Sequence, residues 1–235
     1  MKAAKKVIKA FTSFLFPPLC LHCQSALSAT SPFFCPACLP FFELIDPEQR
    51  CTRCFKALEK KALCTSCRLE KRGHVVMGAA FEYQGPTATL VKLLKGGNAP
   101  YLAKTAAAWL TLQFERLGWP HPDAIVPVPA PWLKSVWRGK DHAAFIAQEL
   151  SGFLKVPLIQ PLWRKSGDIP QGKRNQEQRL LLTAESFQLK RTAKLADKTL
   201  LIVDDVMTTG TTLRCMSEVL MQGFPRKLYA LTLCM

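Results

Sequence analysis

Residues 200–213 read LLIVDDVMTTGTTL: an aliphatic run, two adjacent aspartates, and a small-residue turn that leads into a helical pattern. The aliphatic run predicts a buried strand over Thr199–Val203. Leu213, Met216 and Leu220 recur at helical spacing, which predicts a helix over Leu213–Leu220 with Gly223 as its stop. A strand that turns directly into a helix is half of a βαβ unit, so this stretch indicates an α/β fold.

The turn after the strand has the composition of a phosphate-binding site. A glycine at 210 allows the backbone to turn tightly and to approach a ligand. Unpaired amides of the turn and of the helix N-terminus are donors that suit a phosphate, and threonine hydroxyls add further donors or cap the helix. The two carboxylates suit ribose hydroxyls, or a magnesium ion carried by a polyphosphate. The predicted site residues are Asp204, Asp205, Thr208, Thr209, Gly210, Thr211 and Thr212.

The alternative is a merely capped helix start after a solvated strand end. We favour the phosphate site because the Thr-Thr-Gly-Thr-Thr turn follows the aspartates at this spacing.

Strand-length and helix-length patterns alternate on both sides of this stretch. The predicted strands are Met77–Tyr83, Ala124–Val128, Val156–Ile159 and Leu228–Leu233, and the predicted helices are Thr87–Leu94, Leu102–Leu117 and His142–Leu154. This order predicts a mainly parallel sheet with ligands beyond the carboxyl ends of its strands. The polar, basic segment Gln160–Leu195 has no clear period, and we expect it to be a long functional or mobile loop.

Eight of the ten cysteines form four Cys-x-x-Cys pairs. Two such turns complete a tetrahedral thiolate shell, so the four pairs predict two structural zinc ions with no open position. A disulfide framework is the alternative. Sequential pairing closes shorter loops than a crossed arrangement and is the one we favour. The predicted ligands are Cys20, Cys23, Cys35 and Cys38 for one ion, and Cys51, Cys54, Cys64 and Cys67 for the other.

The chain carries a formal net charge of +15, which points to anionic partners such as nucleic acid, phosphates or acidic lipid heads. No apolar run reaches the roughly 18–20 residues that span a bilayer. Residues 2–16 resemble a signal peptide only superficially, because Lys9 interrupts the apolar part and no cleavage site follows. We therefore expect an amphipathic surface segment there and a cytoplasmic protein. The composition changes after the cysteines, which predicts two parts, residues 1–72 and 73–235.

Residues Val203–Thr212 resemble the phosphoribosyl-pyrophosphate motif of type I phosphoribosyltransferases. Over nearly its full length the chain resembles the ComF family and its GntX-like members, which join a double zinc ribbon to such a domain. Besides the cysteine pairs and this motif, the resemblance rests on the following residues: Leu93-Leu94-Lys95-Gly96-Gly97, Val126-Pro127-Val128-Pro129, Arg138-Gly139, Arg164, Gln171, Arg179 and Phe187.

The resemblance implies that Asp204 and Asp205 hold ribose hydroxyls and that Thr208 to Thr212 cradle the 5′-phosphate. It places Pro127–Pro129 near the pyrophosphate, with Arg138 as a charge partner. The family usually continues Arg-Gly with Phe-Asn-Gln, and this chain has Lys140-Asp141-His142. We therefore assign no catalytic residue, and we expect His142 to be an exposed residue at a helix start.

Two functions remain open at this point. As a phosphoribosyltransferase, the protein would displace pyrophosphate from the ribose, with magnesium and cations such as Arg138, Lys140 or Arg164 stabilising the leaving group. As a non-catalytic nucleic-acid-binding adaptor, it would keep the fold without phosphoribosyl transfer. The resemblance implies single-stranded DNA and other DNA-uptake proteins as partners, in competence or in the use of DNA as a nutrient. Phe55 and Trp163 could stack on bases, although we expect both to be core residues.

Overall fold

A parallel four-stranded sheet forms the centre of the computed structural model, which describes residues 18–27, 33–69, 74–96, 101–130, 141–164 and 184–235. The strand order is β1-β6-β5-β2, and every neighbouring pair is parallel. The strands are β1 (Val75–Phe81), β2 (Ala124–Pro127), β5 (Thr199–Val206) and β6 (Lys227–Cys234). The prediction of an α/β fold with a mainly parallel sheet is confirmed.

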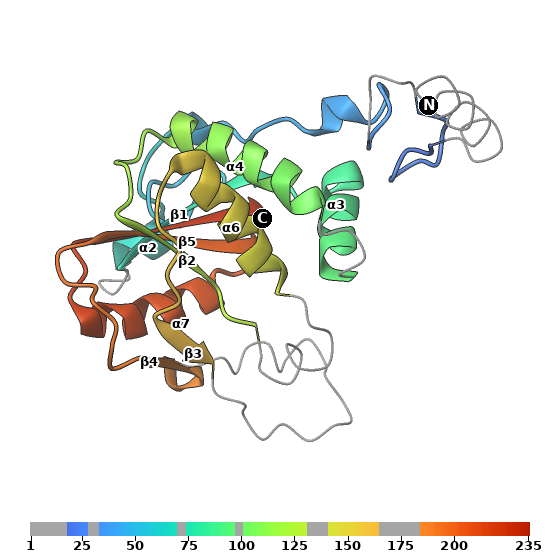
Figure 1. Ribbon diagram of the computed structural model, residues 1–235. Helices are drawn as coiled ribbons and strands as arrows, with labels where there is room; N and C mark the ends of the chain where they lie inside the picture. Colours follow the sequence, from blue (N-terminus) through green and yellow to red (C-terminus); the bar gives the residue numbers. More distant parts are fainter. Residues whose placement is uncertain (1–17, 28–32, 70–73, 97–100, 131–140, 165–183) are drawn as a thin grey trace, which may run out of the picture.

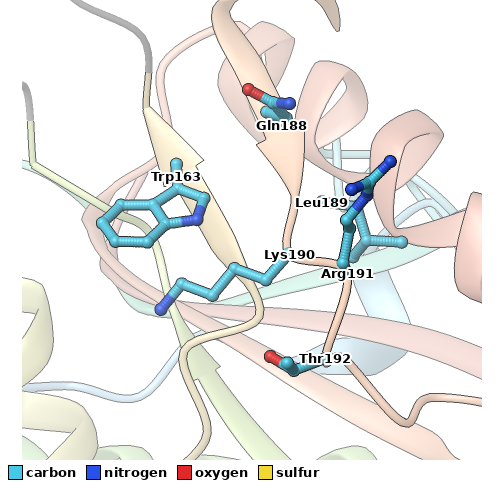
Figure 2. A pocket seen from close by; sticks show the side chains of 6 residues that line it. All are labelled: Trp163, Gln188, Leu189, Lys190, Arg191 and Thr192. Atoms are coloured by element: carbon cyan, nitrogen blue, oxygen red, sulfur yellow. The ribbon is translucent and has the colours of Figure 1, made fainter.

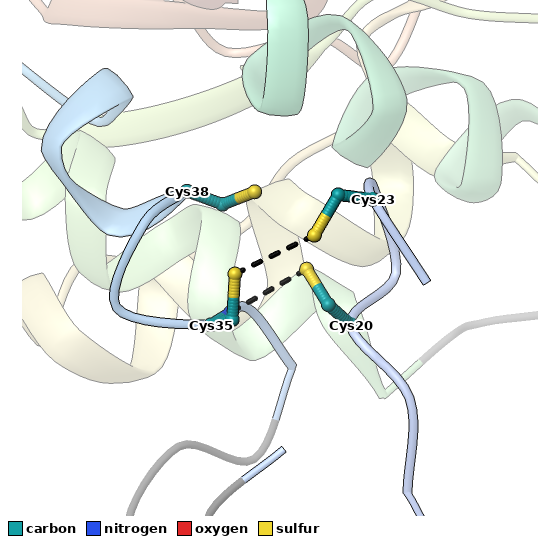
Figure 3. A group of neighbouring side chains, drawn as sticks. All are labelled: Cys20, Cys23, Cys35 and Cys38. Atoms are coloured by element: carbon teal, nitrogen blue, oxygen red, sulfur yellow. Dashed lines mark hydrogen bonds between the residues drawn. The ribbon is translucent and has the colours of Figure 1, made fainter. Parts of the chain in front are cut away.

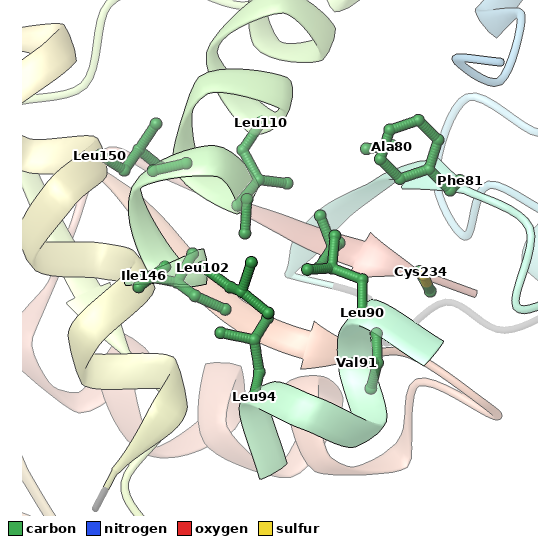
Figure 4. Packing of buried hydrophobic residues seen from close by; sticks show 14 of the residues in the cluster. Ala80, Phe81, Leu90, Val91, Leu94, Leu102, Leu110, Ile146, Leu150 and Cys234 are labelled. Atoms are coloured by element: carbon green, nitrogen blue, oxygen red, sulfur yellow. The ribbon is translucent and has the colours of Figure 1, made fainter. Parts of the chain in front are cut away.

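Helices cover both faces of this sheet (Figure 1). Three lie on one face: α3 (Gly85–Gly96), α4 (Leu102–Leu117) and α6 (His142–Leu154). Their apolar side chains meet in one core cluster, which includes Leu90, Leu102, Leu110, Ile146 and Leu150 (Figure 4). Helix α7 (Thr211–Leu220), followed by the 3-10 turn Met221–Gly223, packs on the other face. This second cluster includes Leu213, Met216 and Leu220, the three residues that predicted the helix.

The boundaries of α4 and α6 agree with the sequence prediction, while β1 begins two residues earlier and β5 continues through both aspartates to Val206. The predicted strand Val156–Ile159 is only a single bridge between Leu158 and Ile125. The amide of Ile125 donates to Pro157 O, and the amide of Ile159 donates to Ile125 O, both at 2.9 Å. Residues 156–159 therefore pair with β2 through this one bridge and do not form a fifth strand of the sheet.

The segment Gln160–Leu195 contains elements that the sequence prediction missed. A short antiparallel sheet pairs β3 (Leu162–Arg164) with β4 (Phe187–Leu189), which follows the 3-10 turn Ala184–Ser186. Three-residue strands are too short to show a period of two, which is why the pattern failed here. Residues 165–183 of the predicted loop lie outside the described residues.

The cysteine-rich part contains two 3-10 turns, Leu39–Phe41 and Pro47–Gln49, and the short helix α2 (Thr65–Leu69). Phe34 and Phe42 belong to the same core cluster as Phe81. The amide of Ile45 donates to Ala80 O at 2.9 Å, and buried Gln113 donates from Nε2 to Ile45 O at 2.9 Å. The first cysteine group therefore packs directly against the sheet domain.

The division at residues 72 and 73 stays a prediction, and the predicted amphipathic segment 2–16 lies outside the described residues. Among the helices that the structure describes, none is long and apolar enough to cross a membrane.

Candidate functional site

The turn between β5 and α7 lies at the carboxyl end of the sheet, where parallel α/β folds bind ligands. Thr208 and Thr209 are exposed, and Thr211 and Thr212 are half-buried. Gly210 is the N-cap of α7 and has a φ of 73°, in the left-handed region. A Cβ at this position would lie 3.0 Å from Met77 Sδ on β1. Both the conformation and the close neighbour therefore favour glycine at this position.

The backbone amides of this turn are available as donors. Among the residues that the structure describes, no hydrogen bond of the Thr208, Thr209, Gly210 or Thr212 amide is found. Around them the structure is fixed: Thr211 N donates to Thr209 Oγ1 at 3.4 Å, and Arg214 Nη1 donates to Thr209 O at 3.1 Å. The turn thus presents unpaired amides beside threonine hydroxyls at a helix N-terminus, as a bound phosphate requires.

The two aspartates face opposite sides of the sheet. Leu201 and Val203 belong to the core cluster under α3, α4 and α6, whereas Leu200 and Ile202 belong to the cluster under α7. Since side chains alternate along a strand, Asp205 points to the first side and Asp204 to the second.

Asp205 is buried and already has two basic neighbours. Only 5% of its surface is exposed. Lys95 Nζ, on α3, lies 3.0 Å from its Oδ1, and His142 Nε2, at the start of α6, lies 3.6 Å from its Oδ2. Both carboxylate oxygens therefore contact basic groups of the protein itself, which holds Asp205 in place.

Asp204 is half-buried and carries an unusual charge environment. Its Oδ1 accepts a hydrogen bond from the Asp205 amide at 2.8 Å. Burial raises the pKa of Asp204 to about 8, and the nearby carboxylates of Asp205 and Asp141 act in the same direction. The Asp205 amide and Lys95 oppose this rise in pKa.

This raised pKa predicts a pH dependence of stability. Between about pH 4 and pH 8, native Asp204 keeps a proton that the unfolded chain has released, so stability falls as the pH rises through this window. Thermal unfolding of the wild type between pH 5 and pH 8 should show this fall, and Asp204→Asn should show a flatter slope. Asp123→Asn, at the amino end of the sheet, is the matched control and should keep the wild-type slope. Equal slopes in Asp204→Asn and wild type would contradict the assignment.

The segment after β2 lies beside this site. The amide of Val128 donates to Val203 O at 2.9 Å, which places Pro129 next to the end of β5. Asp141 caps α6 by accepting from Ala144 N at 3.1 Å, and it also accepts from Ala130 N at 3.3 Å. The hydrogen bonds of Asp141 therefore hold the segment after β2 against the start of α6. Asp141 has a structural role in these contacts.

The predictions for the other residues near the pyrophosphate differ in their outcome. His142 starts α6 as predicted, but its side chain is only 29% exposed, so the expectation of an exposed residue is wrong. Its contact with Asp205 explains the burial. Arg138 and Lys140 lie outside the described residues. Arg164 lies on β3, with its guanidinium 5.6 Å from the Phe187 ring centroid.

The eight paired cysteines form two groups of four (Figure 3 shows the first). Within each group all Sγ atoms lie within 4.8 Å of one another, and the members are Cys20, Cys23, Cys35 and Cys38, and Cys51, Cys54, Cys64 and Cys67. This confirms sequential pairing. Cys23 and Cys35 Sγ are 3.5 Å apart, and Cys54 and Cys64 Sγ are 3.7 Å apart. Four thiolates around zinc at about 2.3 Å require sulfur separations of this size.

Backbone amides point at the sulfur atoms. Cys35 N donates to Cys20 Sγ at 3.4 Å, and Cys64 N donates to Cys51 Sγ at 3.3 Å. Burial works against ionisation of Cys51, but its amide hydrogen bonds outweigh this and lower its pKa to about 6. Burial raises the pKa of Cys38 and Cys67, whose sulfurs lie against neighbouring thiols. A bound zinc ion would deprotonate all four thiols of a group, so the raised and lowered pKa values would no longer oppose one another. Two groups of this kind fit two structural zinc ions.

The two aromatic residues considered for base stacking differ in burial. Phe55 is 3% exposed and belongs to the core, as expected. Trp163 is 62% exposed, so the prediction that it is a core residue is wrong. It occupies the outward position of the short strand β3, which the sequence pattern did not reveal.

Comparison with protein families matches both parts of the chain. The phosphoribosyl transferase domain matches residues 103–234, and the double zinc ribbon domain matches residues 11–68. The chain is also 27% identical over 214 residues to competence protein F of Haemophilus influenzae, covering 86% of this chain and 90% of that protein. These matches confirm the resemblance to the ComF family.

Comparison with solved structures also finds enzymes that are similar to part of the chain. The glutamine phosphoribosylpyrophosphate amidotransferase of B. subtilis is 16% identical with a TM-score of 0.37, and the match covers 63% of this chain and 26% of that one. The chain therefore spans about a quarter of that enzyme. The adenine phosphoribosyltransferase of Saccharomyces cerevisiae is 17% identical with a TM-score of 0.33, over 63% of this chain and 69% of that one.

Proposed function

The chain belongs to the phosphoribosyl transferase domain family, and on that premise we propose that it binds phosphoribosyl pyrophosphate or a related sugar phosphate at the carboxyl end of β5. We further propose that it acts in the uptake and processing of single-stranded DNA, or in the use of DNA as a nutrient. The likeness to competence protein F supports this second part.

The observation that carries the proposal is the turn after β5. It combines left-handed Gly210, packed against Met77, with unpaired amides and exposed threonines at the start of α7. Backbone donors held in this way do not have to reorganise when an anion binds, so little of the binding energy is lost. This arrangement suits the 5′-phosphate of the ligand.

The remaining site residues have different roles in binding the ribose and the pyrophosphate. Asp204 accepts hydrogen bonds from ribose hydroxyls, since it is only half-buried at the strand end and a ligand can reach it. Asp205, between Lys95 and His142, supports the same recognition by fixing the strand end. Pro129, beside the end of β5, lies near the pyrophosphate, and Arg138 is its proposed charge partner.

Magnesium enters only with the ligand in this proposal. Within the described part of the chain, the two cysteine groups are the only clusters of three or more side chains suited to hold a metal ion. The aspartates at the strand end, with Asp205 engaged by Lys95, fit a magnesium ion carried by the pyrophosphate rather than a resident one. Such an ion neutralises charge on the pyrophosphate when it is bound.

Ligand-dependent thermal unfolding tests the proposal. A ligand at about 100 times its Kd stabilises the native state by about 2.7 kcal/mol, which raises the Tm of a chain of this size by roughly 5–10 °C. We expect this rise with magnesium and phosphoribosyl pyrophosphate, and we expect Asp204→Asn to lose most of it. Asp123→Asn, which alters an aspartate at the opposite end of the sheet, should keep the full rise. Equal rises in all three proteins would reject the assignment of Asp204.

The alternative function is a nucleic-acid-binding adaptor that keeps the sugar-phosphate pocket and performs no phosphoribosyl transfer. Release of pyrophosphate from bound phosphoribosyl pyrophosphate, measured in the presence of candidate bases, distinguishes the enzyme from the adaptor. If the protein binds phosphoribosyl pyrophosphate but releases no pyrophosphate with any of the bases tested, the result supports the adaptor.

A further inference from the structure

The sheet formed by β3 and β4 carries an exposed aromatic side chain, Trp163, beside basic residues (Figure 2). A cavity of about 320 Å³ opens on it, and the lining residues are Trp163, Gln188, Leu189, Lys190, Arg191 and Thr192. We call this surface the β3–β4 face. The depression is open to solvent.

The backbone holds this face in a defined conformation. Leu162 and Phe187 are 5% and 3% exposed and anchor the inner side in the core cluster under α7. Trp163 pairs with Gln188 across the two strands, and Lys190 N donates to Pro161 O at 2.8 Å. The buried inner side and the paired backbone fix the outward orientation of Trp163 on β3. Trp163 thus presents its indole to solvent from the paired part of β3.

One lysine lies over the indole of Trp163, and two further basic residues follow it in the sequence. Lys190 Nζ lies 4.5 Å from the Trp163 ring centroid, and the two side chains extend alongside each other in Figure 2. Lys190, Arg191 and Lys194 lie between Glu185 and Asp197 in the sequence. A flat aromatic ring beside clustered cations matches a ligand that is both planar and anionic. Single-stranded nucleic acid combines these two properties in every nucleotide.

We propose that the β3–β4 face binds single-stranded nucleic acid, with one base stacked on Trp163 and the adjacent phosphates contacted by Lys190 and Arg191. This inference rests on the DNA-handling part of the proposed function, and it assigns the strand to residues separate from the sugar-phosphate turn. Stacking accepts any base, so the face binds without sequence preference.

Fluorescence anisotropy with a labelled oligothymidylate of about 15 nucleotides tests this proposal. Trp163→Ala should weaken binding by about 5- to 150-fold, the effect of losing one stacked base, while Trp163→Phe should keep most of the affinity. Phe153→Ala, which alters a 42% exposed aromatic residue on α6, is the matched control and should bind as the wild type does. Lys190→Gln and Arg191→Gln should each reduce the slope of log affinity against log salt by about 0.7.

An abasic oligomer separates stacking from charge. It should bind the wild type more weakly than oligothymidylate, and Trp163→Ala should bind both oligomers equally. Unchanged affinity in Trp163→Ala, or an equal loss for the abasic strand, overturns the proposal. Competition by an acidic peptide as effective as the oligomer also overturns it. The Tm rise with phosphoribosyl pyrophosphate should persist in Trp163→Ala and Trp163→Phe, so failure at this face is distinguishable from failure of the sugar-phosphate site.

Discussion

Removal of zinc is expected to unfold the cysteine-rich part and to loosen the core of the sheet domain with it. Structural zinc contributes on the order of 10–16 kcal/mol to folding, more than the total stability of most domains. Cys20, Cys35 and Cys38 belong to the same core cluster as Phe81 and Leu90, so the damage extends beyond the first site. The prediction is checked by metal analysis and by hydrogen exchange before and after chelation. Metal analysis should find close to two zinc ions per chain.

Single substitutions separate the two zinc ions. Cys20→Ser should reduce the zinc content to about one ion per chain and expose amides of α3, because His22 Nδ1 lies 2.9 Å from Thr89 Oγ1 on that helix. Cys51→Ser should also leave about one ion, with its effect centred on the second site, whose sulfurs form a separate cluster. Cys215→Ser, outside both groups, is the control and should retain both ions. A metal-free chain with full exchange protection over residues 33–69 would refute the structural role of zinc.

Substitution of Gly210 is expected to have the largest effect on the sugar-phosphate site. In Gly210→Ala the new Cβ meets Met77 Sδ at 3.0 Å and the residue must keep a φ of 73°, so the turn shifts. Loss of one hydrogen bond to a charged phosphate, at about 1.5–3 kcal/mol, reduces affinity by roughly 10- to 150-fold. Calorimetric titration with magnesium and phosphoribosyl pyrophosphate measures this loss.

Gly118→Ala is the matched control for this variant. Gly118 also has a positive φ, 63°, at the end of α4, but no atom lies within 4 Å of the Cβ position. This variant should therefore lose stability through the same backbone strain and keep the wild-type affinity. If both glycine variants bind the sugar phosphate equally well, the turn is not the binding site.

Much of the fold could be predicted because local pattern and tertiary role coincide. The apolar spacing of α4 and α6 predicted both helices to the residue, since the same side chains form the core under the sheet. The cysteine pairs predicted both metal groups because two-residue spacing already fixes how two sulfurs converge. In each case the information lies within a few adjacent turns of the chain.

The parts that the sequence did not reveal depend on contacts between distant segments. Lys95 and His142 meet Asp205 only after α3, α6 and β5 pack together. Residue spacing alone could not separate the roles of the two adjacent aspartates, since that separation arises from their opposite sides of one strand. Trp163 was expected in the core because aromatic residues usually pack there, and only its pairing within a three-residue strand turns it outward.

A crystal structure of the zinc-loaded protein with magnesium and phosphoribosyl pyrophosphate examines the sugar-phosphate assignment at atomic detail. We expect the 5′-phosphate to accept hydrogen bonds from amides of residues 208–212, with the ribose hydroxyls at Asp204. A ligand seated elsewhere, with those amides still turned to solvent, would contradict the assignment.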